Sequence, residues 1–376
     1  MQMVNTTSST PDRRRPEPAD DPEASAPQFL EVLVRRAEQA GASDIHLQML
    51  GQPAQITFRL DGVMVPAGGI AGGLAERVFG RIKFLARLKT YQDSLPQDGR
   101  IEQAEIGSQH DIRVATYPTV TGEKIVLRLF RETPTASLPQ LGLPAPACAE
   151  IERFLRQHSG LMLLTGPAGS GKTTTIHACL MHLAAPGGRH IITVEDPVEQ
   201  IIPGIMQTEV HEARGLTFAK AARHLLRQDP EVLVIGEIRD EETATIAVRA
   251  ALTGHLMIST LHAGSCRGVI ERLLVLCPDR YSGISAVEMI LSQRLIRRLC
   301  PECQGAGCAS CLETGFRGRV PVAEWVRLDE TIRGRIREKG PEAVRPATSL
   351  ESAALELVGQ RVTNEAEYER MFGHRP

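Results

Sequence analysis

The residues with the clearest chemical potential form a glycine-rich turn near the middle of the chain. It reads Gly166-Pro167-Ala168-Gly169-Ser170-Gly171-Lys172-Thr173-Thr174 and follows an apolar run, Leu161 to Leu164. The turn fits the pattern G-x-x-x-x-G-K-[ST]. Glycines let successive N–H groups point at phosphate oxygens, and a helix starting there adds its positive end. We therefore expect nucleotide binding by these nine residues, rather than a glycine turn with a stray lysine.

Two side chains of this turn have specific expected roles. Lys172 can reach the β- and γ-phosphates of ATP, and the Thr173 hydroxyl can hold Mg²⁺. A carboxylate is needed opposite them, and Glu237 supplies it after the apolar strand 232–236. Gly236 stands where an Asp is usual, so the Mg²⁺ role falls to Glu237. The alternative for Glu237 is an ordinary surface glutamate.

Other candidate catalytic groups also follow apolar strands. Glu195 and Asp196 end one strand, where Glu195 could polarise an attacking water and Asp196 could cap a helix. His262 follows another strand and could sense the γ-phosphate. A structural role is an equal alternative for His262 and for His255.

These groups need a common scaffold. Apolar strands over 161–165, 190–195, 231–236 and 256–261 are separated by helices, which predicts an α/β fold with a mostly parallel sheet covered on both faces. Ligands of such folds bind at the carboxyl ends of the strands.

Four cysteines form a second constellation. Cys300, Cys303, Cys308 and Cys311 have the spacing C-x₂-C-x₄-C-x₂-C, which suits a structural tetrahedral Zn²⁺ site. The alternative is free thiols left from a lost site. The other four cysteines are scattered and are expected to be small buried residues: Cys148, Cys179, Cys266 and Cys277.

Composition sets broad limits. The chain has 376 residues, 42% of them hydrophobic and 23% charged, with a net charge of -2. This balance predicts two or three globular domains and gives no case for nucleic-acid binding. No apolar stretch reaches membrane-spanning length, and the N-terminus has no signal-peptide core. We expect a cytoplasmic protein that could dock on a membrane through partners.

The chain divides into six expected segments. In order they are a disordered tail (1–27), an α+β domain (28–133), a proline-rich linker (134–146), the ATPase core (147–299), the tetracysteine element (300–318) and a helical region (319–376). Within the α+β domain we expect helices over 29–40 and 75–88 and strands over 43–47, 56–60, 111–116 and 123–130, with a hairpin turn at Asp61-Gly62. A further strand is expected over 319–326.

Taken together, these motifs resemble the type II secretion and type IV pilus assembly ATPases. The resemblance covers about 29–371 and is carried by Gly41-Ala-Ser-Asp-Ile-His46, Phe58-Arg-Leu-Asp-Gly62, Pro96-Gln-Asp-Gly-Arg100, Gly122-Glu-Lys, Val194-Glu-Asp-Pro-Val-Glu199, Leu226-Arg-Gln-Asp-Pro230, Gly236-Glu-Ile-Arg-Asp240 and Thr253-Gly-His-Leu-Met-Ile-Ser-Thr-Leu-His262.

The resemblance implies a RecA-like ATPase domain with a PAS-like N-terminal domain. It implies a homo-hexamer in the cytoplasm, peripheral at the inner membrane. The expected partner is a membrane platform protein, and no nucleic acid is expected to bind. It assigns water activation to Glu195, the Walker B role to Glu237 and the His box to 255–262. Arg113 and Arg128 match family arginines that reach the triphosphate.

The sequence departs from the family pattern in three places. Only four residues separate the two cysteine pairs, where family members have a longer loop, and Ala168 replaces a common threonine. The extra N-terminal docking domain of secretion members is replaced by the expected tail. Three alternatives to an assembly motor stay open: a pilus retraction motor, a nucleic-acid translocase and a scaffold that binds nucleotide without hydrolysis. The cysteines favour assembly over retraction.

Overall fold

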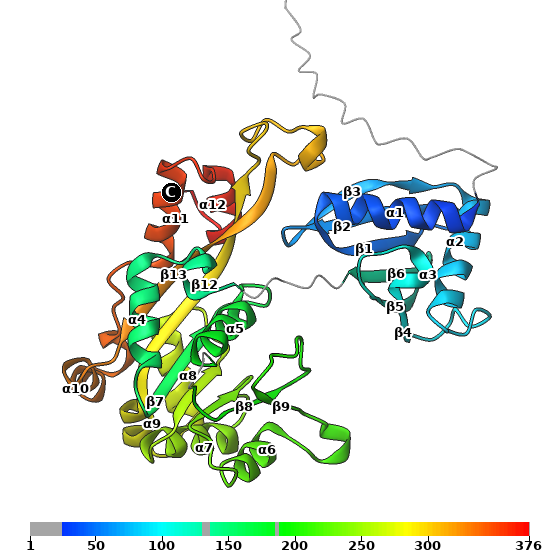
Figure 1. Cartoon of the computed structure of the whole chain (residues 1–376). Coiled ribbons are helices and arrows are strands. Elements are labelled where there is room, and N and C mark those ends of the chain that lie inside the picture. The colour runs from blue at the N-terminus through cyan, green and yellow to red at the C-terminus, as the bar shows by residue number, and fades with distance from the viewer. Residues whose placement is uncertain (1–24, 130–135, 185–187, 376) are drawn as a thin grey trace, which may run out of the picture. The chain divides into compact units, whose positions relative to one another are not determined.

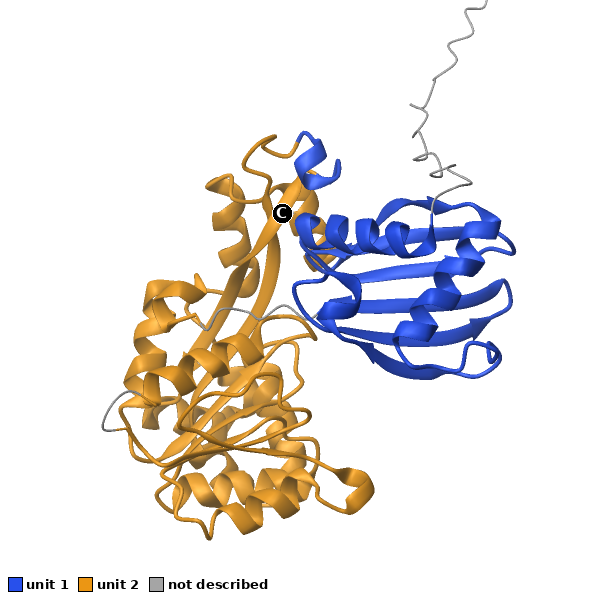
Figure 2. Cartoon of the chain, turned by 45° about the vertical axis from the view of Figure 1, so that its right-hand side comes forward, with its two compact units in different colours: residues 1–132, 306–314 blue, residues 133–305, 315–376 orange. Residues whose placement is uncertain are grey.

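The computed structural model describes residues 25–129, 136–184 and 188–375. The chain forms two compact units, shown in different colours in Figure 2. Unit 1 comprises Met1–Glu132 with the short segment Ala306–Thr314, and unit 2 comprises Thr133–Gly305 and Gly315–Pro376. Most of the expected tail (1–24) and the start of the expected linker lie outside the described residues.

Unit 1 is an antiparallel sheet with helices. Its strands, in the order β3-β2-β1-β6-β5-β4, are β1 (Ala42–Met49), β2 (Ala54–Leu60), β3 (Val63–Ile70), β4 (Gln97–Ile101), β5 (Ile112–Thr119) and β6 (Gly122–Leu129). Its helices are α1 (Ala26–Ala40), α2 (Gly72–Leu85) and the short α3 (Gln103–Ile106). The expected helices and strands of this region are present. No range was predicted for β3, which follows the expected hairpin turn, or for β4.

One face of this sheet is buried and the other carries charge. Residues of β1 alternate, with Ile45 and Leu47 fully buried against the core that α1 and α2 complete. Two local signals behave as expected. Gly41 ends α1 at φ 82°, and Asp61-Gly62 forms the two-residue turn between β2 and β3, with both residues at positive φ.

Unit 2 contains a mixed seven-stranded sheet within the described residues. Its strands, in the order β13-β12-β7-β11-β10-β8-β9, are β7 (Gly160–Thr165), β8 (Ile191–Glu195), β9 (Met206–Glu209), β10 (Val232–Ile235), β11 (Leu256–Thr260), β12 (Val287–Leu299) and β13 (Phe316–Arg327). All neighbouring pairs are parallel except β12 with β13. The four predicted core strands are confirmed, whereas β9 and β12 were not predicted.

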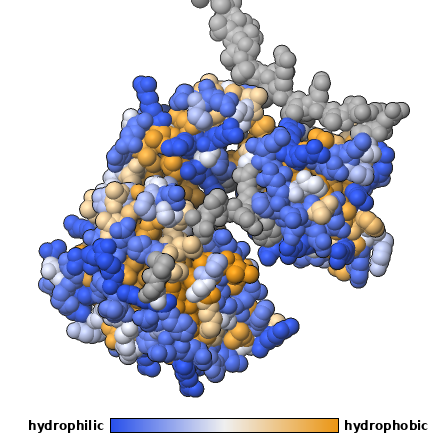
Figure 3. All heavy atoms as spheres, in the orientation of Figure 1, coloured by the Kyte–Doolittle hydropathy of each residue, from blue (hydrophilic) through white to orange (hydrophobic). Residues whose placement is uncertain are grey.

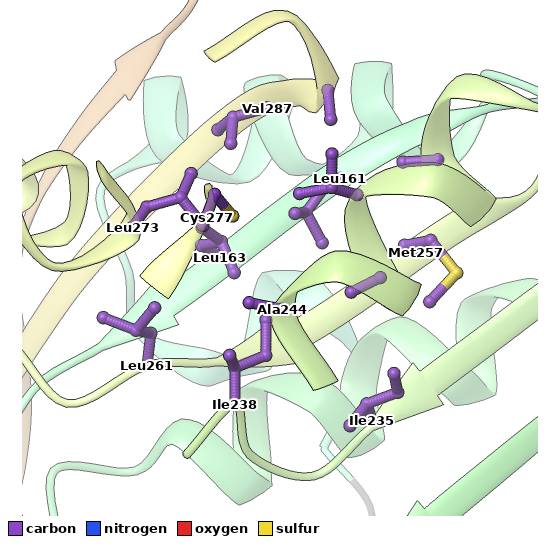
Figure 4. Close-up of a cluster of buried hydrophobic side chains, with 14 of the residues drawn as sticks. Leu161, Leu163, Ile235, Ile238, Ala244, Met257, Leu261, Leu273, Cys277 and Val287 are labelled. Carbon is purple, nitrogen blue, oxygen red and sulfur yellow. The ribbon is translucent and has the colours of Figure 1, made fainter. Parts of the chain in front are cut away.

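Helices cover both faces of the mixed sheet (Figure 1). One face packs on α4 (Ala145–Leu155) and α5 (Lys172–Leu183). The other packs on α6 (Phe218–Leu225), α7 (Glu241–Leu252), α8 (Cys266–Leu276) and α9 (Arg280–Ala286). Figure 4 shows part of this second core, with Leu163 of β7, Ala244 of α7 and Leu273 of α8 gathered between sheet and helices. Burial on both faces explains why these strands are apolar without alternation.

Strands β12 and β13 form a long antiparallel ribbon (Figure 1). Its register runs from Met289↔Arg327 to Leu299↔Phe316, so β13 is longer than the predicted strand 319–326. The chain then continues through α10 (Glu330–Lys339), α11 (Leu350–Gly359) and α12 (Glu365–Phe372). Ile296 and Val322 of the ribbon share a small core with Ala354 of α11 and Tyr368 of α12.

The described part of the expected linker packs on unit 2. It includes a 3₁₀ turn, Leu138–Leu141, and the side chains of Leu138 and Leu143 are buried in the core that contains α4. On the face drawn in Figure 3 the molecular surface is mainly hydrophilic. None of the helices that the structure describes has the length and apolar character of a membrane span.

A buried ion-pair network fastens α12 to β12. The Glu367 side chain is inaccessible to solvent and accepts hydrogen bonds from Arg297 Nη2 at 2.7 Å and from Arg370 Nε at 2.7 Å. Burial by itself raises the pKa of this carboxyl, but the hydrogen bonds from Arg370 and Arg297 outweigh it, so the pKa is lowered from its ordinary value of 4.5.

We expect Glu367→Gln to destabilise the folded chain by about 3 kcal/mol, because two arginines lose their buried anionic partner. Because the folded-state pKa of Glu367 is depressed, its stabilisation is present above the ordinary carboxyl pKa and disappears as pH falls through the folded value. Denaturant unfolding of both proteins as a function of pH measures this. Glu369→Gln is the control, since Glu369 pairs at the surface with the exposed Arg375. An equal loss in both variants would contradict the network.

Candidate functional site

The glycine-rich turn joins the buried strand β7 to the first turn of α5. Gly166, Gly169 and Gly171 have φ values of 140°, 72° and 90°, which side chains rarely tolerate. Pro167, Ala168 and Gly169 are exposed at the tip, whereas Gly166 and Ser170 are buried at the base. The conformation therefore matches a loop whose backbone curls around a ligand, as the motif predicts.

The base of this loop lies against β12. A Cβ on Gly166 would come within 2.2 Å of the Gln293 carbonyl oxygen, and a Cβ on Gly171 would come within 3.0 Å of Gln293 Nε2. Close packing against backbone thus excludes a side chain at Gly166, and the positive φ angles favour glycine at both positions. The buried Ser170 hydroxyl has no hydrogen-bond partner in the described structure, which leaves a polar group inside the loop.

Lys172 lies folded over the loop. Its ammonium donates to the carbonyl oxygens of Gly166 at 2.8 Å and Pro167 at 3.0 Å. Burial lowers the pKa of Lys172 from its ordinary value, and the negative charge of Glu237 acts in the opposite direction. Thr173 is exposed and Thr174 is half-buried, so the Thr173 hydroxyl is accessible to a ligand.

Glu237 is the centre of a charged cluster at the end of β10. Its Oε1 lies 3.0 Å from Nε2 of His262, and its Oε2 accepts from Nε of Arg239 at 2.9 Å. Arg239 also pairs with Asp196 at 3.3 Å and with Glu212 at 3.8 Å. The hydrogen bond to Glu237 is the largest of the effects that raise the pKa of Arg239. Glu237 therefore connects the ends of three strands, β8, β10 and β11.

The loop that carries His262 is fixed to the end of β7. Thr165 Oγ1 donates to the Ala263 carbonyl at 2.8 Å and accepts from the Ala263 N–H at 2.9 Å. His255, by contrast, hydrogen-bonds through Nδ1 to the Ala250 carbonyl at 3.1 Å, which supports its structural alternative. The structure thus brings His262 to Glu237 and leaves His255 at the far end of β11.

Glu195 ends β8 and is half-buried. Its Oε1 accepts from Thr193 Oγ1 at 2.5 Å and from Gln207 Nε2 at 3.0 Å, so one carboxylate oxygen is held by two neutral donors. The backbone N–H of Gly236 bonds the Val194 carbonyl at 2.8 Å, which places the ends of β8 and β10 side by side. The helix-cap alternative for Asp196 is wrong, because the chain bends after it and Asp196 pairs with Arg239 instead.

Arg113 and Arg128 lie on the charged face of unit 1. The strand register aligns Arg59, Asp44, Arg128, Arg113 and Arg100 directly across five strands, so their side chains share one face. The buried Asp44 carboxylate pairs with Arg128 at 3.0 Å and with Arg59 at 3.4 Å. Two of these four arginines, Arg113 and Arg128, were expected from the family resemblance, whereas Arg59 and Arg100 join the row only through the strand register.

The four clustered cysteines converge between β12 and β13. Their sulfur atoms all lie within 4.8 Å of one another, and Cys308 Sγ is 3.7 Å from Cys311 Sγ. In a tetrahedral zinc site with Zn–S bonds of about 2.3 Å, sulfur atoms lie about 3.8 Å apart. The donor set and its spacing therefore fit zinc. Outside this cluster, burial raises the pKa of Cys179 to about 12 and of Cys277 to about 11, as expected for inert buried thiols.

Three contacts of the site were not predicted. Arg239 stands within the motif Gly236–Asp240, but two of its partners, Asp196 and Glu212, come from other parts of the chain. Gln207 reaches Glu195 from β9, and Gln293 reaches the loop from β12. For Gln293 the available signal was its position inside an apolar run, since a polar side chain in a buried strand needs a partner.

Comparisons with known proteins agree with this geometry. A family model described as Type II/IV secretion system protein matches residues 19–370. The chain belongs to that family. A protein transport protein HofB homolog of Haemophilus influenzae is 38% identical, over 92% of this chain and 73% of the relative. The type II secretion system protein HxcR of Pseudomonas aeruginosa is 39% identical, over 85% of this chain and 71% of the relative.

Solved structures are similar over nearly the whole chain. The ATPase DotB of Legionella pneumophila has a TM-score of 0.72 at 22% identity, covering 96% of this chain and 99% of that one, which supports the fold. The pilus retraction motor PilT, solved with bound ADP, has a TM-score of 0.63 at 25% identity, covering 91% and 96%. As a member of the secretion family with an intact glycine-rich loop and lysine, the chain is a P-loop ATPase.

We expect purified secretion ATPase to contain about one zinc per chain, since four thiolates complete a tetrahedral site. Cys311→Ser should lower the zinc content well below one and reduce the melting temperature, as measured by elemental analysis and calorimetry. Cys148→Ser is the control, because Cys148 is half-buried outside the cluster. Full zinc content in Cys311→Ser would contradict the site.

Proposed function

We propose that this secretion ATPase is a homo-hexameric assembly motor that hydrolyses ATP to build a pilus or pseudopilus. In this proposal it works in the cytoplasm, peripheral at the inner membrane, on a membrane platform protein. Unit 2 is RecA-like, and the antiparallel sheet of unit 1, with α1 and α2 on one face, supports a PAS-like domain. The observation that carries the proposal is the Glu237–His262 pair at the ends of β10 and β11, together with Lys172 in the glycine-rich turn that follows β7.

Different residues of unit 2 have different roles in the transfer of the γ-phosphoryl group to water. Backbone N–H groups of the loop, which Pro167 lacks, and the Lys172 ammonium stabilise the negative charge that develops on the γ-phosphate. Thr173 and Glu237 would hold Mg²⁺, which supplies further charge neutralisation at the phosphates. When ATP binds, the Lys172 ammonium would donate to phosphate oxygens in place of the Gly166 and Pro167 carbonyl oxygens.

Glu195 orients the attacking water. One of its oxygens is held by Thr193 and Gln207, which fixes the direction of the carboxylate. His262 and Arg239 hold Glu237 from two sides, so a change at the phosphates reaches the ends of β8 and β11 through one carboxylate. Arg113 and Arg128 contribute positive charge to the triphosphate in this proposal.

The relatives support assembly over retraction. Those named for type II secretion or protein transport are 38% and 39% identical, whereas the retraction motor PilT is 25% identical. The fit of the cysteine cluster to zinc supports the same choice, as the sequence analysis expected.

We expect Lys172→Ala to lose most ATP affinity, because the phosphates lose the ammonium group that contacts them in this proposal. Glu195→Gln should still bind ATP but turn over about 10² to 10⁴ times more slowly, because water loses its general base. Fluorescent-nucleotide titration and phosphate release by the assembled ring measure the two effects.

Glu199→Gln is the matched control, since Glu199 is an exposed carboxylate on the loop that follows Glu195. Wild-type turnover in Glu195→Gln would contradict its water-activating role. Stimulation of turnover by single-stranded DNA would favour the translocase alternative.

A further inference from the structure

The feature that the proposed chemistry leaves unused is a buried amide beneath the phosphate-binding loop. Gln293 lies in the middle of β12 and its side chain is 2% exposed. Its Nε2 donates to the Ser170 carbonyl at 2.8 Å, and its Oε1 accepts from Thr175 Oγ1 at 3.0 Å. One side chain, from a strand that is remote in sequence, therefore bonds both the loop at Ser170 and the first turn of α5 at Thr175.

These contacts act on the part of the loop that has least freedom. Ser170 immediately precedes Gly171, whose φ of 90° begins α5, and Thr175 completes the first turn of that helix. The backbone of Gln293 also contributes, because its carbonyl oxygen occupies the space that a Gly166 side chain would need. Gln293 thus contacts the start, the end and the helical continuation of the loop.

Burial makes the two hydrogen bonds important for the shape of the loop. The Ser170 carbonyl and the Thr175 hydroxyl are removed from bulk water. Without Gln293, neither group could hydrogen-bond to water unless the structure opened locally. If the Gln293 amide were absent, peptide groups of the loop would rotate until the Ser170 carbonyl found another hydrogen-bond donor. The N–H groups that face phosphate belong to those same peptide groups.

We propose that Gln293 is a positioning residue that holds the glycine-rich loop in its phosphate-binding conformation before nucleotide arrives. This inference rests on the proposed function in one respect, namely that the loop binds the phosphates of ATP. Gln293 does not contact the reacting atoms; it acts through Ser170 and Thr175.

The neighbouring strand makes a second contact of the same kind. Glu324 of β13 is 5% exposed, and its Oε1 accepts from the Cys266 N–H at 2.6 Å, at the start of α8 just after the His262 loop. Glu324 lies directly opposite Ser292 in the ribbon, one residue from Gln293. The ribbon therefore supports both functional loops of the site from adjacent positions.

The test compares Gln293→Met with Ser292→Ala in the full-length chain. Methionine keeps the length of the side chain and removes both hydrogen bonds. Ser292 is equally buried on the same strand, but its hydroxyl has no hydrogen-bond partner in the described structure, so its removal controls for a change in the strand itself. Thr175→Val, alone and combined with Gln293→Met, tests whether the two residues act through one contact.

Hydrogen–deuterium exchange of residues 166–175 in nucleotide-free protein is the direct measurement. We expect Gln293→Met to speed exchange in this segment by about tenfold and Ser292→Ala to leave it unchanged. In steady-state kinetics, KM for ATP should rise by about tenfold while kcat falls less, because the loop binds phosphate before and during the reaction. Thr175→Val should add little to Gln293→Met.

The outcomes separate this inference from the proposed function. A lower melting temperature with unchanged KM and unchanged local exchange would make Gln293 merely structural and overturn the inference. Failure of the wild-type protein to bind ATP would overturn the proposed function, while the exchange measurement would still decide whether Gln293 shapes the loop.

Discussion

The close contact between the glycine-rich loop and strand β12 is the constraint on which the site depends. Gly166 has no space for a side chain because the Gln293 carbonyl occupies it, and the Gln293 amide bonds Ser170 and Thr175. Strand β12 also pairs in parallel with β7, the strand that leads into the loop. The same strand, β12, therefore supports both β7 and the loop. The nucleotide site is therefore built on a rigid layer of backbone.

The charged side chains of the site are paired with one another in the described structure. Glu237 faces His262 and Arg239, and its negative charge also acts on Lys172. Arg239 in turn joins Asp196 to this group. A bound triphosphate would add negative charge to this cluster. There, Glu237 and Asp196 already accept hydrogen bonds from Arg239, and Glu195 accepts them from neutral side chains. A change at one strand end can thus be transmitted to the next through hydrogen bonds.

The ribbon β12–β13 serves two regions of the chain. Its inner half belongs to the mixed sheet and carries Gln293 and Glu324, and its outer half leads to the four cysteines. Glu367 fastens α12 to the same ribbon through Arg297. In unit 1, a sheet covered on one face leaves a row of arginines on the other, arranged around the buried Asp44. Each unit therefore uses a sheet to align charged side chains that are remote in sequence.

The sequence by itself determined the features that are encoded locally. The glycine-rich loop, Glu237 after its strand, the turn at Asp61-Gly62 and the cysteine spacing all depend on residues within a few positions of one another. Only the tertiary structure revealed β12 and the contacts of Gln293, Arg239 and Gln207, since these contacts join segments that are remote in sequence. It likewise revealed β3, an edge strand whose Pro66 obscures its pattern. The physical reason is that a local pattern fixes backbone conformation, whereas a buried polar side chain is defined by the group that packing places opposite it.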